Sequence, residues 1–153
     1  MNFKEKNIDI FEEYENAQHG MRAMAFCCSG DVKLQAGISQ KIDEKYHIEE
    51  MMEERMYRYG RQYEAGKAYL FRIDADKVLI PLVNRDKKWQ GTTYDEMLAC
   101  IMALKGLLLE HKIRILIIPK ISCGLDMMNW DIIRPIIKEQ FEDTDIDITV
   151  CYI

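Results

Sequence analysis

The residues best suited to chemistry lie in segment 119–126, which reads Pro-Lys-Ile-Ser-Cys-Gly-Leu-Asp. This segment follows the apolar run 113–118, which predicts a buried strand. A strand that ends in small residues and glycine presents backbone N–H groups, and these can close around phosphate or pyrophosphate. Asp126 adds a carboxylate at the end of the loop. The segment therefore predicts a ligand loop with an acidic group beside it.

A second loop of small residues, Gln35-Ala36-Gly37-Ile38, lies far upstream. It opens a helical pattern, because apolar residues recur four apart at Ile38, Ile42 and Tyr46. In α/β proteins, ligands bind outside the carboxyl ends of the strands, where such loops gather. The two loops together favour a cleft for a nucleotide diphosphate.

The rest of the chain alternates between strand and helix patterns. We expect strands at 8–11, 23–28, 68–73, 77–83, 113–118 and 146–152. We expect one helix that begins at residue 37, one at 49–59, one that ends at residue 109 and one at 130–141. Thr93 and Glu96 have the spacing of a capping box for the helix that ends at 109. This alternation predicts a three-layer α/β/α fold with a mixed, largely parallel central sheet.

Length and composition indicate one globular domain over residues 1–153, with 48% hydrophobic and 31% charged residues. No apolar run approaches the roughly 20 residues that span a bilayer. The first residues, Met-Asn-Phe-Lys-Glu-Lys, lack the apolar segment of a secretory signal, so we expect a cytoplasmic protein. A net charge of −5 argues against direct binding to duplex nucleic acid. We also expect a monomer.

The five cysteines are odd in number and lack the spacing of metal ligands. We therefore expect reduced, mostly buried thiols, no metal and no cofactor. Cys123 lies within the predicted phosphate loop. It either packs as a small side chain or is reactive, if a helix N-terminus lowers its pKa.

Several segments together resemble the macrodomain family, and most closely its terminal ADP-ribose protein glycohydrolase branch. They are Ile8-Asp9-Ile10, the stretch 26–39, Leu82-Val83-Asn84-Arg85, Thr92-Thr93-Tyr94, the loop 119–126 with Trp130, and the final strand from 144 to 150. The resemblance covers nearly the whole chain and implies ADP-ribose or an ADP-ribosylated substrate as the partner. The ligand-binding set that it implies is Asp9, Ile10, Ser29, Gln35, Ala36, Gly37, Ile38, Pro119, Ser122, Cys123, Gly124 and Leu125.

Within that set, the resemblance places Asp9 at the adenine amino group and the 35–38 loop over the distal ribose and a phosphate. The backbone amides of 122–125 would face the other side of the pyrophosphate. Two simpler alternatives stay open. Asp9 could cap a local turn, and Asp126 could be the N-cap of the following helix.

The resemblance also implies catalytic roles for Asp126 and Arg85. In this branch a lysine attacks the anomeric carbon of the distal ribose and an aspartate supports proton transfer. The aspartate matches Asp126, but the lysine position falls on Arg85. Arginine stays protonated in proteins, so it should hold a phosphate or the Asp126 carboxylate rather than form a covalent intermediate.

Three alternatives remain for this chemistry. Lys87 could be a displaced nucleophile, since strand alternation would aim it to the same side as Arg85. Asp126 could instead act as a general base on water. Arg85 could also be a surface residue in a polar turn.

Gln35 and Ser122 replace two glycines of the family pattern, so their side chains could crowd the phosphates or force a different backbone. Gln35 could also offer its amide to a ribose hydroxyl. The sequence therefore predicts an ADP-ribosyl hydrolase with Arg85 in place of lysine. The alternatives are a non-catalytic module that binds ADP-ribose and a module for a related nucleotide-derived metabolite.

Overall fold

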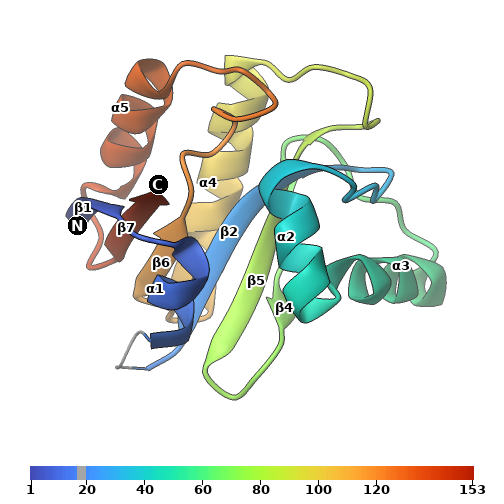
Figure 1. Cartoon of the computed structure of the whole chain (residues 1–153), viewed down its shortest axis with the longest axis horizontal. Coiled ribbons are helices and arrows are strands. Elements are labelled where there is room, and N and C mark those ends of the chain that lie inside the picture. Colours follow the sequence, from blue (N-terminus) through green and yellow to red (C-terminus); the bar gives the residue numbers. More distant parts are fainter. Residues whose placement is uncertain (17–19) are drawn as a thin grey trace.

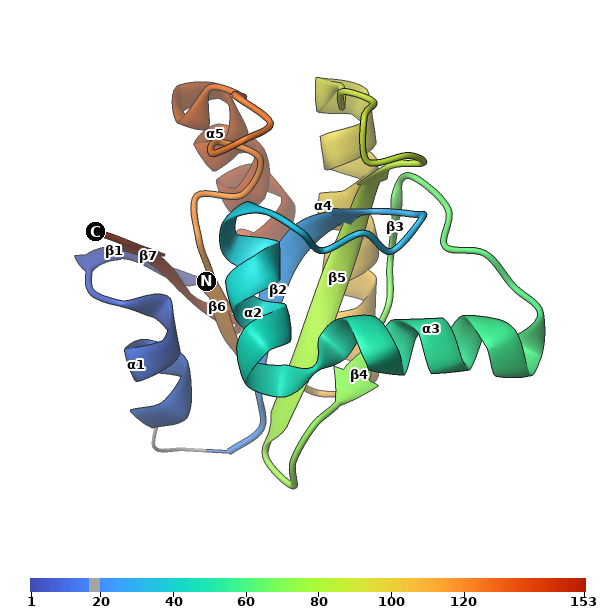
Figure 2. The same cartoon turned by 45° about the vertical axis from the view of Figure 1, so that its right-hand side comes forward.

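The computed structural model describes residues 1–16 and 20–153, which form a seven-stranded mixed sheet with helices on both faces (Figures 1 and 2). The strands are β1 (Asn2–Asn7), β2 (Arg22–Ser29), β3 (Lys67–Ala68), β4 (Phe71–Arg72), β5 (Lys77–Arg85), β6 (Ile115–Ile118) and β7 (Asp147–Tyr152). The helices are α1 (Ile10–Asn16), α2 (Gly37–Tyr46), α3 (Ile48–Tyr59), α4 (Tyr94–Glu110) and α5 (Trp130–Phe141). The strand order is β1-β7-β6-β2-β5-β3, and β4 also pairs with β5.

Only the short strands β3 and β4 run antiparallel to a neighbour; all the other strand pairs given by the sheet register are parallel. The predicted α/β/α fold with a mixed, largely parallel sheet is confirmed. Parallel strands place their carboxyl ends at one edge of the sheet. The loops that follow β2, β5 and β6 therefore meet there.

The sheet is buried on both faces because alternate side chains of its central strands enter two different cores. On β2, Ala23 and Ala25 pack in the core formed with α4 and α5. Met24 and Phe26 of the same strand pack in the core formed with α1, α2 and α3. Figures 1 and 2 show these two helical layers on opposite sides of the sheet.

Two expected strands differ from the structure. The predicted strand at 8–11 is wrong, because α1 begins at Ile10 and the first strand is β1. The physical reason is a helix cap: Oδ1 of Asp9 accepts hydrogen bonds from the backbone N–H groups of Phe11 (2.8 Å) and Glu12 (3.3 Å). The expected strand at 68–73 is reduced to the two-residue strands β3 and β4.

The other predicted elements are present with small shifts at their ends. Thr93 caps α4 as expected, since its Oγ1 accepts from the backbone N–H of Glu96 at 3.1 Å. Among the described residues, no helix has the length and apolar character needed to cross a bilayer. The expected compartment and oligomeric state stay predictions.

Candidate functional site

A cleft of about 330 Å³ opens at the carboxyl edge of the sheet, beyond the ends of β2, β5 and β6. Nine residues that the sequence assigned to the site line it, namely Ala36, Gly37, Ile38, Arg85, Pro119, Ser122, Gly124, Leu125 and Asp126. They come from three separate parts of the chain. The fold therefore brings both predicted ligand loops and both predicted catalytic residues to one cavity.

Asp126 and Arg85 form an ion pair on the wall of this cleft. Oδ1 of Asp126 lies 3.0 Å from Nη1 of Arg85, and both side chains are largely buried. Oδ2 of Asp126 accepts a hydrogen bond of 2.8 Å from Nδ2 of Asn84. Asp126 is thus held by a cation on one oxygen and an amide on the other. It does not cap α5, because Asn129 does so by accepting from the backbone N–H of Asp131.

Nη2 of Arg85 makes no hydrogen bond or ion pair to the described residues. Its Nη1 donates to Asp126 and, at 2.8 Å, to Oδ1 of Asn84. Its Nε is buried and has no hydrogen-bond partner among the described residues. Because a guanidinium stays charged and only donates, Arg85 can bind a carboxylate or phosphate group but cannot act as an amine nucleophile.

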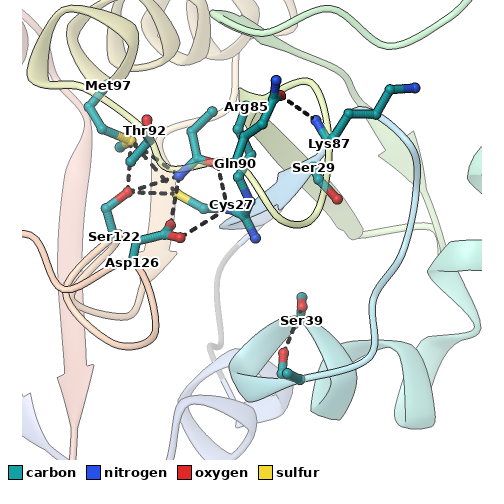
Figure 3. Close-up of polar contacts among 12 residues, drawn as sticks. Cys27, Ser29, Ser39, Arg85, Lys87, Gln90, Thr92, Met97, Ser122 and Asp126 are labelled. Atoms are coloured by element: carbon teal, nitrogen blue, oxygen red, sulfur yellow. Dashed lines mark hydrogen bonds and ion pairs between the residues drawn. The ribbon is translucent and has the colours of Figure 1, made fainter.

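Ser122 adopts the backbone conformation that a glycine would favour. Its φ is +62°, in the left-handed region, although its side chain is buried. The hydroxyl accepts a hydrogen bond from Nδ2 of Asn84 at 3.0 Å. It also lies 2.8 Å from Sδ of Met97 (Figure 3). The serine therefore has the left-handed backbone that glycine favours, and its side chain adds buried contacts to Asn84 and Met97.

The start of α2 forms the opposite wall. Its N-cap residue, Ala36, provides no side-chain acceptor, so the first N–H groups of the helix lack a capping side chain. Gly37 has a φ of +63°, and a Cβ there would lie 3.0 Å from Cδ1 of Leu125. The two ligand loops therefore approach each other closely at this point. A helix N-terminus that faces a cleft favours an anion through its N–H groups and dipole.

The nearby lysines do not point at Asp126. The Lys87 side chain extends away from it and from Arg85 (Figure 3). Nζ of Lys88 instead donates to Oε1 of Gln35 at 2.7 Å, on the protein surface. Gln35 therefore contacts Lys88 rather than the cleft, and the alternation argument for Lys87 fails because β5 ends at Arg85.

Five residues of the expected ligand-binding set do not line the cleft: Asp9, Ile10, Ser29, Gln35 and Cys123. Asp9 caps α1 and Ile10 is a core residue. Ser29 is buried and donates to Asp31 at 2.5 Å. Burial raises the pKa of the Cys123 thiol, which favours the packing role over the reactive one.

Sequence reasoning missed four residues of the cleft wall, Cys27, Ser39, Lys120 and Ile121, and also missed Asn84 behind it. Nζ of Lys120 lies 4.6 Å from the ring centroid of Tyr152, so the C-terminal aromatic residue lies near this wall. Burial raises the pKa of Cys27 far above its usual range, so this thiol is protonated. Asn84 belongs to the segment 82–85 that carries the family resemblance and precedes Arg85, but neither signal assigns it a partner in the site.

A larger groove of about 830 Å³ lies elsewhere, between the end of α3 and the segment before β4. Three of its four charged side chains, Arg55, Glu64 and Lys67, contact the protein itself. Lys67 pairs with Glu64 at 2.7 Å, and Nη1 of Arg55 donates to the Leu70 carbonyl at 2.9 Å. No group of three or more potential metal ligands occurs in the part of the chain that the structure describes. The 330 Å³ cleft is therefore the better candidate site.

No family model matches the sequence. Curated relatives do: ADP-ribose glycohydrolase OARD1 from Homo sapiens is 28% identical over 129 residues, which cover 84% of this chain and 80% of that protein. The Bos taurus protein of the same name matches equally. Both chains are covered over most of their length.

Among solved structures, the macrodomain of Thermus aquaticus DarG superposes with a TM-score of 0.80 at 10% identity, over 99% of this chain and 97% of that chain. Thermosipho africanus DarTG in complex with ADP-ribose gives a TM-score of 0.81 at 12% identity, over 98% of this chain and 41% of that chain. These likenesses concern the fold. The chain therefore has the macrodomain fold, and its sequence is similar to proteins named as ADP-ribose glycohydrolases.

Proposed function

We propose that this chain binds ADP-ribose in the 330 Å³ cleft and removes ADP-ribosyl groups from a modified macromolecule. The observation that carries the proposal is the Arg85–Asp126 ion pair, which faces the uncapped start of α2 across the cleft. The relatives named as ADP-ribose glycohydrolases and the fold shared with a protein solved with ADP-ribose support it.

In this proposal the diphosphate lies between the two ligand loops. The free N–H groups at the start of α2 face one phosphate, and the backbone of 122–125 faces the other. The distal ribose lies at Asp126 and Arg85. The adenine lies toward Asp9, whose Oδ2 is not used in capping α1. The other expected ligand-binding residues then support the cleft from behind or from the side; they are Ile10, Ser29, Gln35 and Cys123.

We assign the hydrolytic step to water. The water oxygen forms a bond to the anomeric carbon, the bond from that carbon to the modified group breaks, and its electron pair leaves with that group. Asp126 accepts the proton of the water as general base. Arg85 holds Asp126 through Nη1 and offers the N–H groups of Nη2 to the ligand. No covalent intermediate on residue 85 forms, because the arginine keeps its proton.

One observation favours a second function, ADP-ribose binding without turnover. Each oxygen of Asp126 already accepts a hydrogen bond, one from Arg85 and one from Asn84. Only the remaining lone pairs are available to a water molecule. A binding module needs the cleft and its N–H groups but no proton acceptor.

The first experiment is calorimetric titration of the protein with ADP-ribose. If the protein gives no heat of binding with millimolar ADP-ribose, the proposal is refuted. Turnover is then measured on mono-ADP-ribosylated protein and nucleic acid for the wild type, Asp126→Asn and Arg85→Lys. We expect Asp126→Asn to bind ADP-ribose and to lose about 10²- to 10⁴-fold in rate, the usual contribution of general acid–base catalysis.

The outcome for Arg85→Lys separates the two functions. If the wild type releases ADP-ribose, hydrolysis does not require a lysine at position 85. If only Arg85→Lys releases it, the wild type is a binding module. Titration with ADP-ribose analogues modified on the distal ribose tests whether a related metabolite is the better ligand.

A further inference from the structure

Asn84 lies beside the cleft but does not line it, and both polar atoms of its side chain are hydrogen-bonded. It has no exposed surface and is the second-last residue of β5. A buried amide must find partners for its donors and its acceptor, because an unpaired polar group costs free energy in the interior. The identity of those partners therefore shows what this residue does.

Each polar atom of the Asn84 side chain has a partner in the site. Oδ1 accepts from Nη1 of Arg85 at 2.8 Å. Nδ2 donates to Oδ2 of Asp126 at 2.8 Å and to Oγ of Ser122 at 3.0 Å. The side chain thus joins two elements of the cleft wall, the end of β5 and the 122–126 loop with its terminal carboxylate.

These partners fix which way the amide points. Arginine only donates and an ionised carboxylate only accepts, so Oδ1 must face Arg85 and Nδ2 must face Asp126. An aspartate here would present acceptors to Asp126 and repel it. A leucine would fill the space but leave Arg85, Asp126 and Ser122 each one hydrogen bond short. An amide of this size can accept a hydrogen bond from the cation through Oδ1 and donate one to the anion through Nδ2.

The strand is irregular at this residue. Cys28 pairs with Val83 and Ser29 pairs with Arg85, so Asn84 has no partner on β2. Such β-bulges redirect side chains at the ends of strands. In a regular strand, consecutive side chains point to opposite faces. The bulge thus occurs where the consecutive residues Asn84 and Arg85 contact the same carboxylate.

We infer that Asn84 is a positioning residue, which holds Asp126 and Arg85 in the arrangement that receives the distal ribose. The inference rests on the proposed ADP-ribose function. Asn84 acts through a shared hydrogen-bond donor: Nη1 of Arg85 donates to both Asn84 and Asp126, so Nη2 remains for the ligand. Asn84 itself touches no ligand.

The test compares ADP-ribose with ADP, which lacks the distal ribose. Asn84→Leu and Asn84→Asp are titrated with both ligands by calorimetry, after circular dichroism has shown that each is folded. We expect affinity for ADP-ribose to fall about tenfold or more, and affinity for ADP to change less than about threefold. Thr144→Val is the control, because Thr144 is also buried and hydrogen-bonded but lies at the start of the loop before β7.

The second arm asks whether Asn84 acts through Arg85. In an Arg85→Ala background, Asn84→Leu should cause a smaller loss of ADP-ribose affinity than it does in the wild type, since one of the three partners of Asn84 is already gone. Equal losses for both ligands, unchanged ADP-ribose affinity in a folded variant, or additive losses in the double variant would overturn the inference. If Asn84→Leu does not fold, Asn84→Ser gives the same comparison. A wild type that binds no ADP-ribose would instead refute the proposed function, before any variant is made.

Discussion

The two loops that form the cleft each carry a larger residue where the family pattern has glycine, and they accommodate it in opposite ways. Gln35 is exposed, has no left-handed backbone and bonds only to Lys88 on the surface. Ser122 is buried, keeps a φ of +62° and bonds to Asn84 and Met97. The residue that replaces glycine therefore lies on the surface in the first loop, whereas in the second loop it is part of the site.

This difference has a physical cause in what surrounds each loop. The 35–38 loop leads into a helix at the surface, where a side chain can turn to solvent. The 122–126 loop follows a buried strand, and its Ser122 packs against Met97 of α4, so the Ser122 side chain has few free directions. Changes in the second loop should cost more stability than changes in the first, and the following variants test this in order of expected effect.

The largest effect is expected for Ser122→Val. A β-branched residue is strongly disfavoured at this φ, and the lost hydroxyl leaves Asn84 without one acceptor. We expect the free energy of unfolding to fall by about 3 kcal/mol, measured by urea denaturation.

Two further substitutions separate the causes. Ser122→Ala removes the hydroxyl and keeps the strain, while Ser122→Gly removes both. Glycine should therefore be more stable than alanine here by about 1 kcal/mol. Equal stabilities for the two would show that the left-handed backbone is not strained.

A smaller effect is expected for Gly37→Ala in the other loop. Its φ is +63° and the new Cβ would meet Leu125, which is exposed and free to move. The backbone should cost about 1 kcal/mol of unfolding free energy, with a severalfold loss of ADP-ribose affinity by calorimetry. Gly60→Ala is the matched control, since Gly60 has a φ of +62° with nothing within 4 Å. It should lose the same stability and bind ADP-ribose normally.

The smallest effects are expected for Gln35→Ala and Lys88→Ala. These exposed residues bond only to each other through their side chains, so each variant should remain within about 0.5 kcal/mol of the wild type. Turnover should change less than about threefold in the same assays. Loss of turnover in Lys88→Ala would show that this lysine takes part in the chemistry.

The sequence by itself determined the fold class and most of the elements. The apolar run at 113–118, the Thr93 cap and the helix at 130–141 were predicted because local patterns and caps dictate them. It failed at 8–11, where an alternating apolar pattern was read as a strand. A single carboxylate, Asp9, caps a helix there instead.

The sequence also identified both ligand loops and both residues of the ion pair, because these lie next to recognisable strand ends. Only the tertiary structure decided which side chains meet. Lys88 reaches Gln35, Lys87 points away, and Asn84 joins Arg85 to Asp126, residues 41 positions apart in the chain. Such contacts depend on the register of β2 with β5 and on a bulge at one residue, which no local pattern in the sequence specifies.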